Sequence, residues 1–139
     1  MFLINHYGIQ LGDKVSRLKR GVPFIRHYAV YLGANEQGIH RFAENNVNNG
    51  VQIVTADDFF SNAEAIQVDR TNTNWEQRMR AVRLAEQKVG QKYNLLDYNC
   101  EHFANEVTIG HRRSKQVSWG LGISAFLIVG VASTLISKR

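Results

Sequence analysis

Hydrophobic and polar positions alternate along the first half of the chain and change to a helical spacing in the second half. Short apolar or alternating runs bounded by Gly, Asn or Asp predict strands. The predicted strands cover residues 14–18, 27–32, 39–43, 51–54 and 65–68, with a short helical or irregular connection over 56–62. These runs favour a small antiparallel sheet.

Two helices are predicted after the last strand. Thr73 or Asn74 can cap the first, over residues 75–89, before Gly90. Its apolar face holds Trp75, Met79, Val82 and Ala85. The second begins near Asn99 and ends before Gly110, and its apolar face holds Cys100, Phe103, Ala104 and Val107. Strands followed by helices indicate an α+β domain with an antiparallel sheet.

The chain continues into a long apolar run. Residues 116–137 contain no Lys, Arg, Asp or Glu. About 20 helical residues span the roughly 30 Å of a bilayer's hydrocarbon core, so the run predicts a transmembrane helix. A buried terminal helix is the alternative, but no polar stripe of helical period interrupts the run.

The flanks of this run predict its orientation. Trp119 stands near its start, where an indole favours the membrane interface, and the larger basic cluster lies on its N-terminal side. We therefore expect a single-pass C-terminal anchor with the body of the protein on the cytoplasmic side. The expected organisation is a domain over 1–112, a basic juxtamembrane linker over 113–117 and the anchor over 118–137.

Length, charge and cysteine content narrow the functional classes. The chain has 139 residues, enough for one domain, and a net charge of +5. Basic residues cluster in two segments, around 14–26 and 111–115. They fit an anionic membrane better than nucleic acid, because no basic stripe with interleaved aromatic residues is present. The single cysteine allows no internal disulfide and favours a reducing compartment.

Cys100 and three histidines are the candidate chemical groups. A cysteine in the first turn of a helix faces backbone N–H groups that favour the thiolate and can stabilise an oxyanion. His27 and His40 lie on predicted strands, whereas His102 points about 200° around the helix from Cys100 and is not expected to act as its base. On spacing alone, Cys100 is equally a core residue. A zinc site of His27, His40 and Cys100 is a further alternative by ligand type.

A family resemblance favours Cys100 as a nucleophile over Cys100 as a core residue. Asn-Cys-Glu-His-Phe at 99–103 resembles the signature of the lecithin:retinol acyltransferase-like family. Gly12-Asp13 and residues 26–33 resemble its histidine-bearing strand, and His40 matches its second histidine. The resemblance covers roughly residues 10–112 and extends to the hydrophobic anchor of many members. It implies a circularly permuted papain-like or NlpC-like fold, in which the histidines precede the cysteine.

The resemblance also implies roles for these residues. Cys100 would be the nucleophile, His27 the general base and His40 the group that orients His27, with Asn99 and Cys100 at the oxyanion site and helix cap. Members move acyl groups from phospholipids through an acyl-cysteine intermediate. We therefore expect a membrane-anchored thiol acyltransferase or phospholipase A acting on glycerophospholipids, with no cofactor or metal and no nucleic-acid partner.

Two other functions stay open. The same triad could attack a peptide bond, as in a thiol peptidase or amidase. Alternatively, the motif could be scaffolding in a non-enzymatic, membrane-anchored interaction protein, with Asn99 as helix cap and Cys100 and Phe103 as core. The oligomeric state and the acyl acceptor are not predicted.

Overall fold

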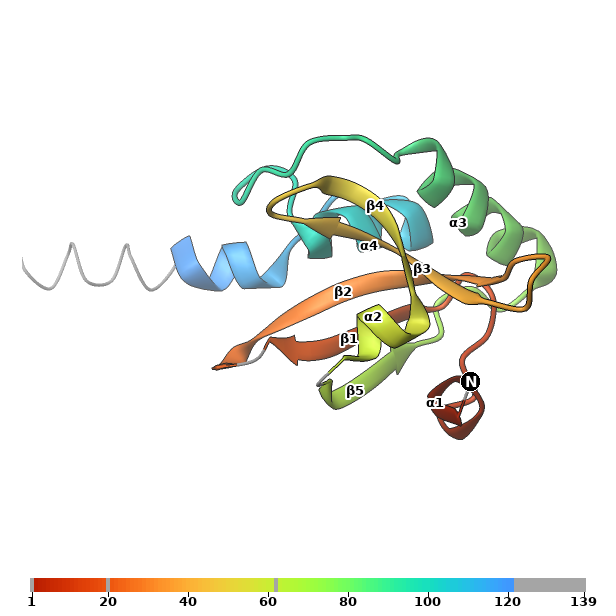
Figure 1. Ribbon diagram of the computed structural model, residues 1–139. Coiled ribbons are helices and arrows are strands. Elements are labelled where there is room, and N and C mark those ends of the chain that lie inside the picture. The colour runs from red at the N-terminus through yellow and green to blue at the C-terminus, as the bar shows by residue number, and fades with distance from the viewer. Residues whose placement is uncertain (1, 20, 62, 122–139) are drawn as a thin grey trace, which may run out of the picture.

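A five-stranded antiparallel sheet forms the centre of the molecule (Figure 1). The computed structural model describes residues 2–19, 21–61 and 63–121. In chain order the elements are α1 (Phe2–His6), β1 (Lys14–Lys19), β2 (Val22–Ala34), β3 (His40–Asn46), β4 (Gly50–Thr55), α2 (Ala56–Phe60), β5 (Glu64–Asp69), α3 (Trp75–Gln87) and α4 (Cys100–Ile109). The strand order is β4-β3-β2-β1-β5, and residues 115–121 form further helical turns.

The predicted α+β class and antiparallel sheet are confirmed. Each predicted strand is present, but β2 is much longer than the apolar run over 27–32, because its ends carry polar or exposed residues that still join the ladder. The short helix α1 was not predicted. The finer expectation of a permuted papain-like arrangement stays a prediction.

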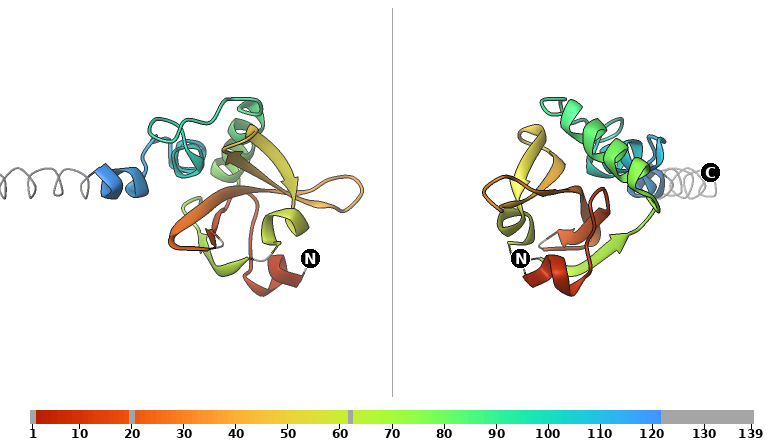
Figure 2. Two further views of the ribbon diagram at one scale, coloured as in Figure 1. Left: turned by 60° about the vertical axis from the view of Figure 1, so that its left-hand side comes forward. Right: turned by 90° about the vertical axis from the view of Figure 1, so that its right-hand side faces the viewer.

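Both faces of the sheet are covered, which explains why the central strand β2 is apolar on both sides. Val30 and Leu32 pack with residues of α3 and α4, including Val82 and Phe103. The alternate positions Ala29 and Tyr31 pack in a second cluster with residues of α1 and α2. Figure 2 shows α3 and α4 on one side of the sheet, with α1 and α2 away from them.

The face predicted for the first long helix is partly wrong. Val82 and Ala85 are buried as expected, together with Ala81. Trp75 is instead 68% exposed, because it is the first residue of α3 and lies beyond the part of the helix that packs on the sheet. Of the two candidate caps, Asn74 is the one used: its side chain accepts from the N–H of Gln77.

Gly12 and Asp13 join the sheet to α3. A Cβ at Gly12, whose φ is +77°, would lie 2.8 Å from the carbonyl oxygen of Arg78. The fully buried Asp13 carboxylate pairs with the Arg78 guanidinium at 2.9 Å and accepts from the backbone N–H of Gln10 at 2.9 Å. The close approach of Gly12 to the backbone of Arg78 requires glycine. The adjacent Asp13 carboxylate neutralises the Arg78 guanidinium, which is itself largely buried.

The segment predicted as a basic linker, 113–117, is attached to the domain. Ser114 is buried, and its hydroxyl donates to the buried Glu101 carboxylate at 2.8 Å. The backbone N–H of Gln116 donates to the same carboxylate oxygen at 3.1 Å. Asn105 donates to the carbonyl of Arg113 at 2.8 Å. These bonds hold the chain against the start of α4.

The predicted anchor falls mostly outside the described residues. Of the range 118–137, the structure describes only 118–121, which are helical. Within the described part of the chain, no helix combines the length and apolar character needed to cross a bilayer. The anchor over 118–137 therefore stays a prediction.

The Asp13–Arg78 pair yields a first prediction, for stability. Replacing Asp13 by Ala leaves the Arg78 guanidinium without its buried partner, and we expect the free energy of unfolding to fall by about 3–5 kcal/mol. Asp69→Ala is the matched control, since its pair with Lys14 at 2.9 Å uses a carboxylate that is 56% exposed, and it should cost less than about 1 kcal/mol. Urea denaturation of both variants measures this, and equal losses would contradict it.

Candidate active site

Cys100 is the first residue of α4, and the Asn99 side chain fixes that helix end. The side-chain Oδ1 of Asn99 accepts from the backbone N–H groups of Glu101 and His102, each at 3.0 Å. In return, Nδ1 of His102 accepts from the backbone N–H of Asn99 at 3.2 Å, which completes a capping box. The predicted cap is thus confirmed.

His102 is occupied by this structural role. Its ring is part of the capping box, and burial lowers its pKa below the ordinary value. A ring that accepts from the backbone at the helix end is not aimed at the Cys100 thiol. The expectation that His102 is not the base agrees with this position.

Cys100 is buried but is not part of either hydrophobic core cluster. Its side chain lines a groove, and its sulfur lies 3.9 Å from the carbonyl oxygen of Arg26. The thiol therefore stands between the start of α4 and strand β2, at the floor of a surface opening. This position differs from that of a cysteine enclosed in the core.

His27, on β2, lies between two partners. Its Nε2 is 2.6 Å from Oε2 of Glu44, and the Cys100 side chain lies close enough to the ring to shift its pKa. Burial alone lowers the pKa of His27, but the interactions with Cys100 and Glu44 together outweigh burial and raise the pKa to about 9. The protonated ring is stabilised by a carboxylate on one side and a sulfur on the other.

Glu44, on β3, is the partner that sequence reasoning missed. It lies directly across from Ala29 of β2, and Gln52 of β4 donates to its Oε1 at 2.8 Å. Burial raises the pKa of Glu44, but the hydrogen bond and charge of His27, together with the hydrogen bonds from Gln52 and Asn46, outweigh burial and keep the pKa below its ordinary value. A carboxylate that directly follows the apolar run of a strand was a weak signal, and the strand register was needed to place it beside His27.

The structure does not bring His40 to His27. His40 begins β3 and lies across from Ala34, seven residues along β2 from His27. At about 3.3 Å per residue this is roughly 23 Å. The ring of His40 instead shares a hydrogen bond with the hydroxyl of Tyr31. The expectation that His40 orients His27 is corrected: Glu44 occupies that position, because β2 and β3 are long enough to separate the two histidines.

The distance between His27 and His40 also excludes the zinc site considered for His27, His40 and Cys100. His40 is too far from His27 to share a metal ion with it and Cys100. Across residues 2–19, 21–61 and 63–121, no group of His, Cys, Asp and Glu side chains is arranged to hold a metal.

An apolar groove of about 670 Å³ opens above Cys100. Its lining comes from the start of β2, the loop before α4 and the helical turns over 115–121. The larger apolar residues are Phe24, Ile25, Tyr93, Leu95, Leu96, Val117, Trp119 and Leu121. Lys115 is the one ionisable side chain besides Cys100 and Tyr93 among the lining residues. The groove can accommodate a long apolar group next to the thiol.

The site therefore contains a thiol at a helix N-terminus, an imidazole beside it and a carboxylate that forms a hydrogen bond with the imidazole. This is the arrangement of nucleophile, base and orienting group found in thiol-dependent acyl-transfer enzymes. His27 precedes Cys100 in the chain, which is the order of histidine and cysteine implied by the family resemblance.

Comparison with known proteins defines the family. The family model for lecithin retinol acyltransferase matches residues 2–113, and the chain belongs to this family. It is similar to "Phospholipase A and acyltransferase 3" of Pongo abelii and of Homo sapiens, with 40% identity over 60 residues in each case. The match covers 36% of this chain and 37% of each relative, so the chain spans little more than a third of the curated relatives' length.

The pairing of His27 with Glu44 gives a second prediction. In Glu44→Gln the ring loses its carboxylate partner, and the pKa of His27 should fall from about 9 by about one to three pH units. The pH titration of the histidine ring resonances by NMR measures it.

His40→Asn is the control for this titration. If His40 does not touch the pair, the His27 titration in His40→Asn follows the unmodified protein. A pKa of His27 that falls in His40→Asn but not in Glu44→Gln would restore the original assignment of His40.

Proposed function

We propose that this protein is a thiol acyltransferase or phospholipase A that acts on glycerophospholipids through an acyl-cysteine intermediate. The observation that carries the proposal is that Cys100, at the start of α4, lines an apolar groove and lies beside a His27 ring that Glu44 holds at 2.6 Å. Family membership and the acyltransferase and phospholipase names of the relatives support it.

In the first step, Cys100 is the nucleophile. Its sulfur attacks the carbonyl carbon of a lipid ester, and the N–H groups at the start of α4, beginning with that of Cys100, stabilise the oxyanion. The ester C–O bond then breaks, and the proton held on His27 passes to the departing lysolipid oxygen. The acyl group remains on Cys100 as a thioester.

In the second step, His27 is the general base. It takes the proton of an incoming amine, alcohol, lysolipid or water, whose nitrogen or oxygen attacks the thioester carbonyl. The C–S bond breaks and Cys100 leaves as a thiolate. Glu44 holds the ring in position and stabilises its protonated form, which is the role expected at first for His40.

The groove favours a lipid over a peptide. A peptide backbone offers N–H and C=O groups that need partners along its length, whereas the wide part of this groove is lined mainly by aliphatic and aromatic carbon. An acyl chain needs no such partners. The lipid proposal therefore takes precedence over the peptidase alternative.

The proposed partner is a bilayer, with the domain held at its surface on the cytoplasmic side. The uncharged run over 116–137 and the basic cluster before it support a single-pass anchor over 118–137. Such an anchor would keep the thiol close to lipid esters.

The acyl-enzyme is the direct test, and the third prediction. Phosphatidylcholine with labelled acyl chains should transfer its label to Cys100, detected by intact-protein and peptide mass spectrometry. Cys100→Ala should carry none. His27→Gln should form the adduct about 10²–10⁴-fold more slowly, because the proton transfer is lost. His40→Asn, outside the site, should react at the rate of the unmodified protein.

The outcomes separate the functions considered for this chain. Absence of label and of lipid hydrolysis across several head groups would contradict the proposal. Cleavage of a peptide panel without any lipid turnover would favour the peptidase. A cellular effect that survives Cys100→Ala would favour the non-enzymatic interaction protein.

Removal of the tail is the fourth prediction. A chain ending after Leu121 keeps Gln116 and its bonds to the domain. If residues 122–137 supply most of the anchor, full-length protein should remain in the membrane pellet after alkaline carbonate extraction, and the shortened chain should be released. Retention of the shortened chain after carbonate treatment would contradict the anchor.

A further inference from the structure

The mouth of the groove above Cys100 carries apolar side chains that point into solvent. They come from the start of β2, the loop before α4 and the helical turns after α4, which lie at one end of the molecule (Figure 1). We call them the apolar rim: Phe24, Ile25, Leu95, Leu96, Trp119 and Leu121. Phe24 is 90% exposed and Trp119 is 75% exposed. Large side chains in such positions gain nothing from folding.

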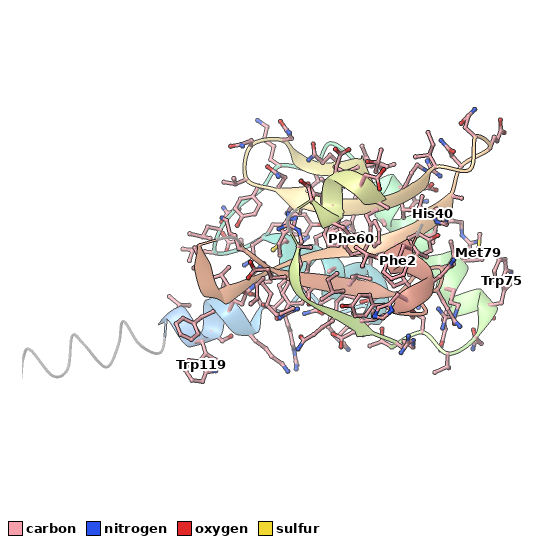
Figure 3. The ribbon with its side chains drawn as sticks, turned by 60° about the horizontal axis from the view of Figure 1, so that its bottom comes forward. Phe2, His40, Phe60, Trp75, Met79 and Trp119 are labelled. Carbon is pink, nitrogen blue, oxygen red and sulfur yellow. The ribbon has the colours of Figure 1, made fainter. Side chains whose placement is uncertain are left out.

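Two other exposed aromatic residues, Trp75 and Phe2, lie apart from the rim. Trp75 lies at the end of the molecule opposite Trp119, and Phe2 lies well away from the rim (Figure 3). Single exposed apolar residues are common on protein surfaces, whereas a contiguous apolar patch marks an interaction site. The rim is therefore expected to be covered by an interaction partner.

Hydrogen bonds join the three segments of the rim to one another. The side chain of Gln116 accepts from the N–H of Arg26 at 2.8 Å and donates to the carbonyl of the same residue at 3.2 Å. Asn99 donates to the carbonyl of Leu95 at 3.2 Å and to the hydroxyl of Ser114 at 3.3 Å. The rim is thus a preformed surface around the groove that Cys100 lines.

The charges around the rim fit an anionic surface. Lys115 lines the groove, and the exposed Arg113 precedes it by two residues, whereas Arg112 pairs with Glu106 at 3.5 Å. Asp97 is the carboxylate that follows Leu96 in the loop. Lys115 and Arg113 against the one carboxylate of Asp97 leave these segments with an excess of positive charge. An apolar patch beside cations matches the interface of a bilayer that contains anionic lipids.

The course of the chain also points to a bilayer. Trp119 and Leu121 belong both to the rim and to the uncharged run over 116–137. The run therefore continues directly from the surface that surrounds Cys100. A bilayer that accommodates the run meets the rim at the same place.

We infer that the apolar rim is a lipid-docking surface, whose side chains enter the interface of an anionic bilayer and place the groove mouth at the level of the lipid esters. This inference rests on the proposed function, since it names how the same site meets its substrate. It adds that the domain itself inserts, through β2 and the loop before α4, and is not only tethered by the tail.

Tryptophan fluorescence of the full-length chain can test this. With Trp75→Phe and Trp119→Phe as background, Phe24→Trp places the one indole on the rim. Phe2→Trp, also at an exposed phenylalanine, places it away from the rim and is the matched control. Vesicles of phosphatidylcholine brominated on its acyl chains, with phosphatidylglycerol, quench an indole that enters the bilayer. Leu96→Trp repeats the measurement on the second loop, should Phe24→Trp fail to fold.

We expect emission from position 24 or 96 to lose at least about half its intensity and shift to the blue, and emission from position 2 to change by less than a tenth. Equal emission from positions 24 and 2 would overturn the inference, because the tail alone would then hold the domain. The inference would also be overturned if vesicles leave the rim indole unquenched and a protein partner binds over the rim instead. The measurement needs no turnover, so an unlabelled Cys100 with a quenched rim would contradict the proposed function and leave the docking surface standing.

Discussion

The seating of the N-terminus of α4 on strand β2 is the constraint on which the site depends. The thiol belongs to the helix and the imidazole to the strand, and more than seventy residues of chain separate Cys100 from His27. Asn99 fixes the helix start, Gln116 pairs with the backbone of Arg26, and the buried Glu101 carboxylate holds Ser114. A shift of the helix by one turn would carry the sulfur about 5 Å away from the ring. Any chemistry at Cys100 therefore requires that the contact between the start of α4 and strand β2 is stable.

Polar residues in the interior perform this positioning, and that explains why so much of α4 is buried. Glu101, His102 and Asn105 all lie within the domain and each has a partner in the cap or in the segment after the helix. Buried groups of this kind cost desolvation free energy unless every one is bonded. The Asn-Cys-Glu-His motif is thus largely a structural device, which places one reactive side chain among residues that hold the helix.

The contacts around the start of α4 support both the catalytic residues and the apolar rim. The bonds that hold residues 113–117 against α4 also bring Trp119 and Leu121 beside Phe24 and Leu96. An apolar entrance and a buried, charged pair beneath it thus share one set of supports. Desolvation at such a site strengthens the interaction between the His27 ring and Glu44, because the surrounding dielectric is low.

The sequence by itself determined the order of the strands and of the two long helices, and it singled out Cys100 as the candidate nucleophile. Strand alternation, the Asn99 and Gly110 caps and the apolar face of α4 are local properties, so their periods could be read directly. The length of β2, the exposure of Trp75 and the helix α1 were not predictable in this way, because packing partners decide them. Tertiary structure also decided the third member of the site. His40 and Glu44 are four residues apart on one strand, and only the register of β3 against β2 places Glu44 at His27 and sends His40 to Tyr31. Register is set by contacts between distant segments, which no single stretch of sequence contains.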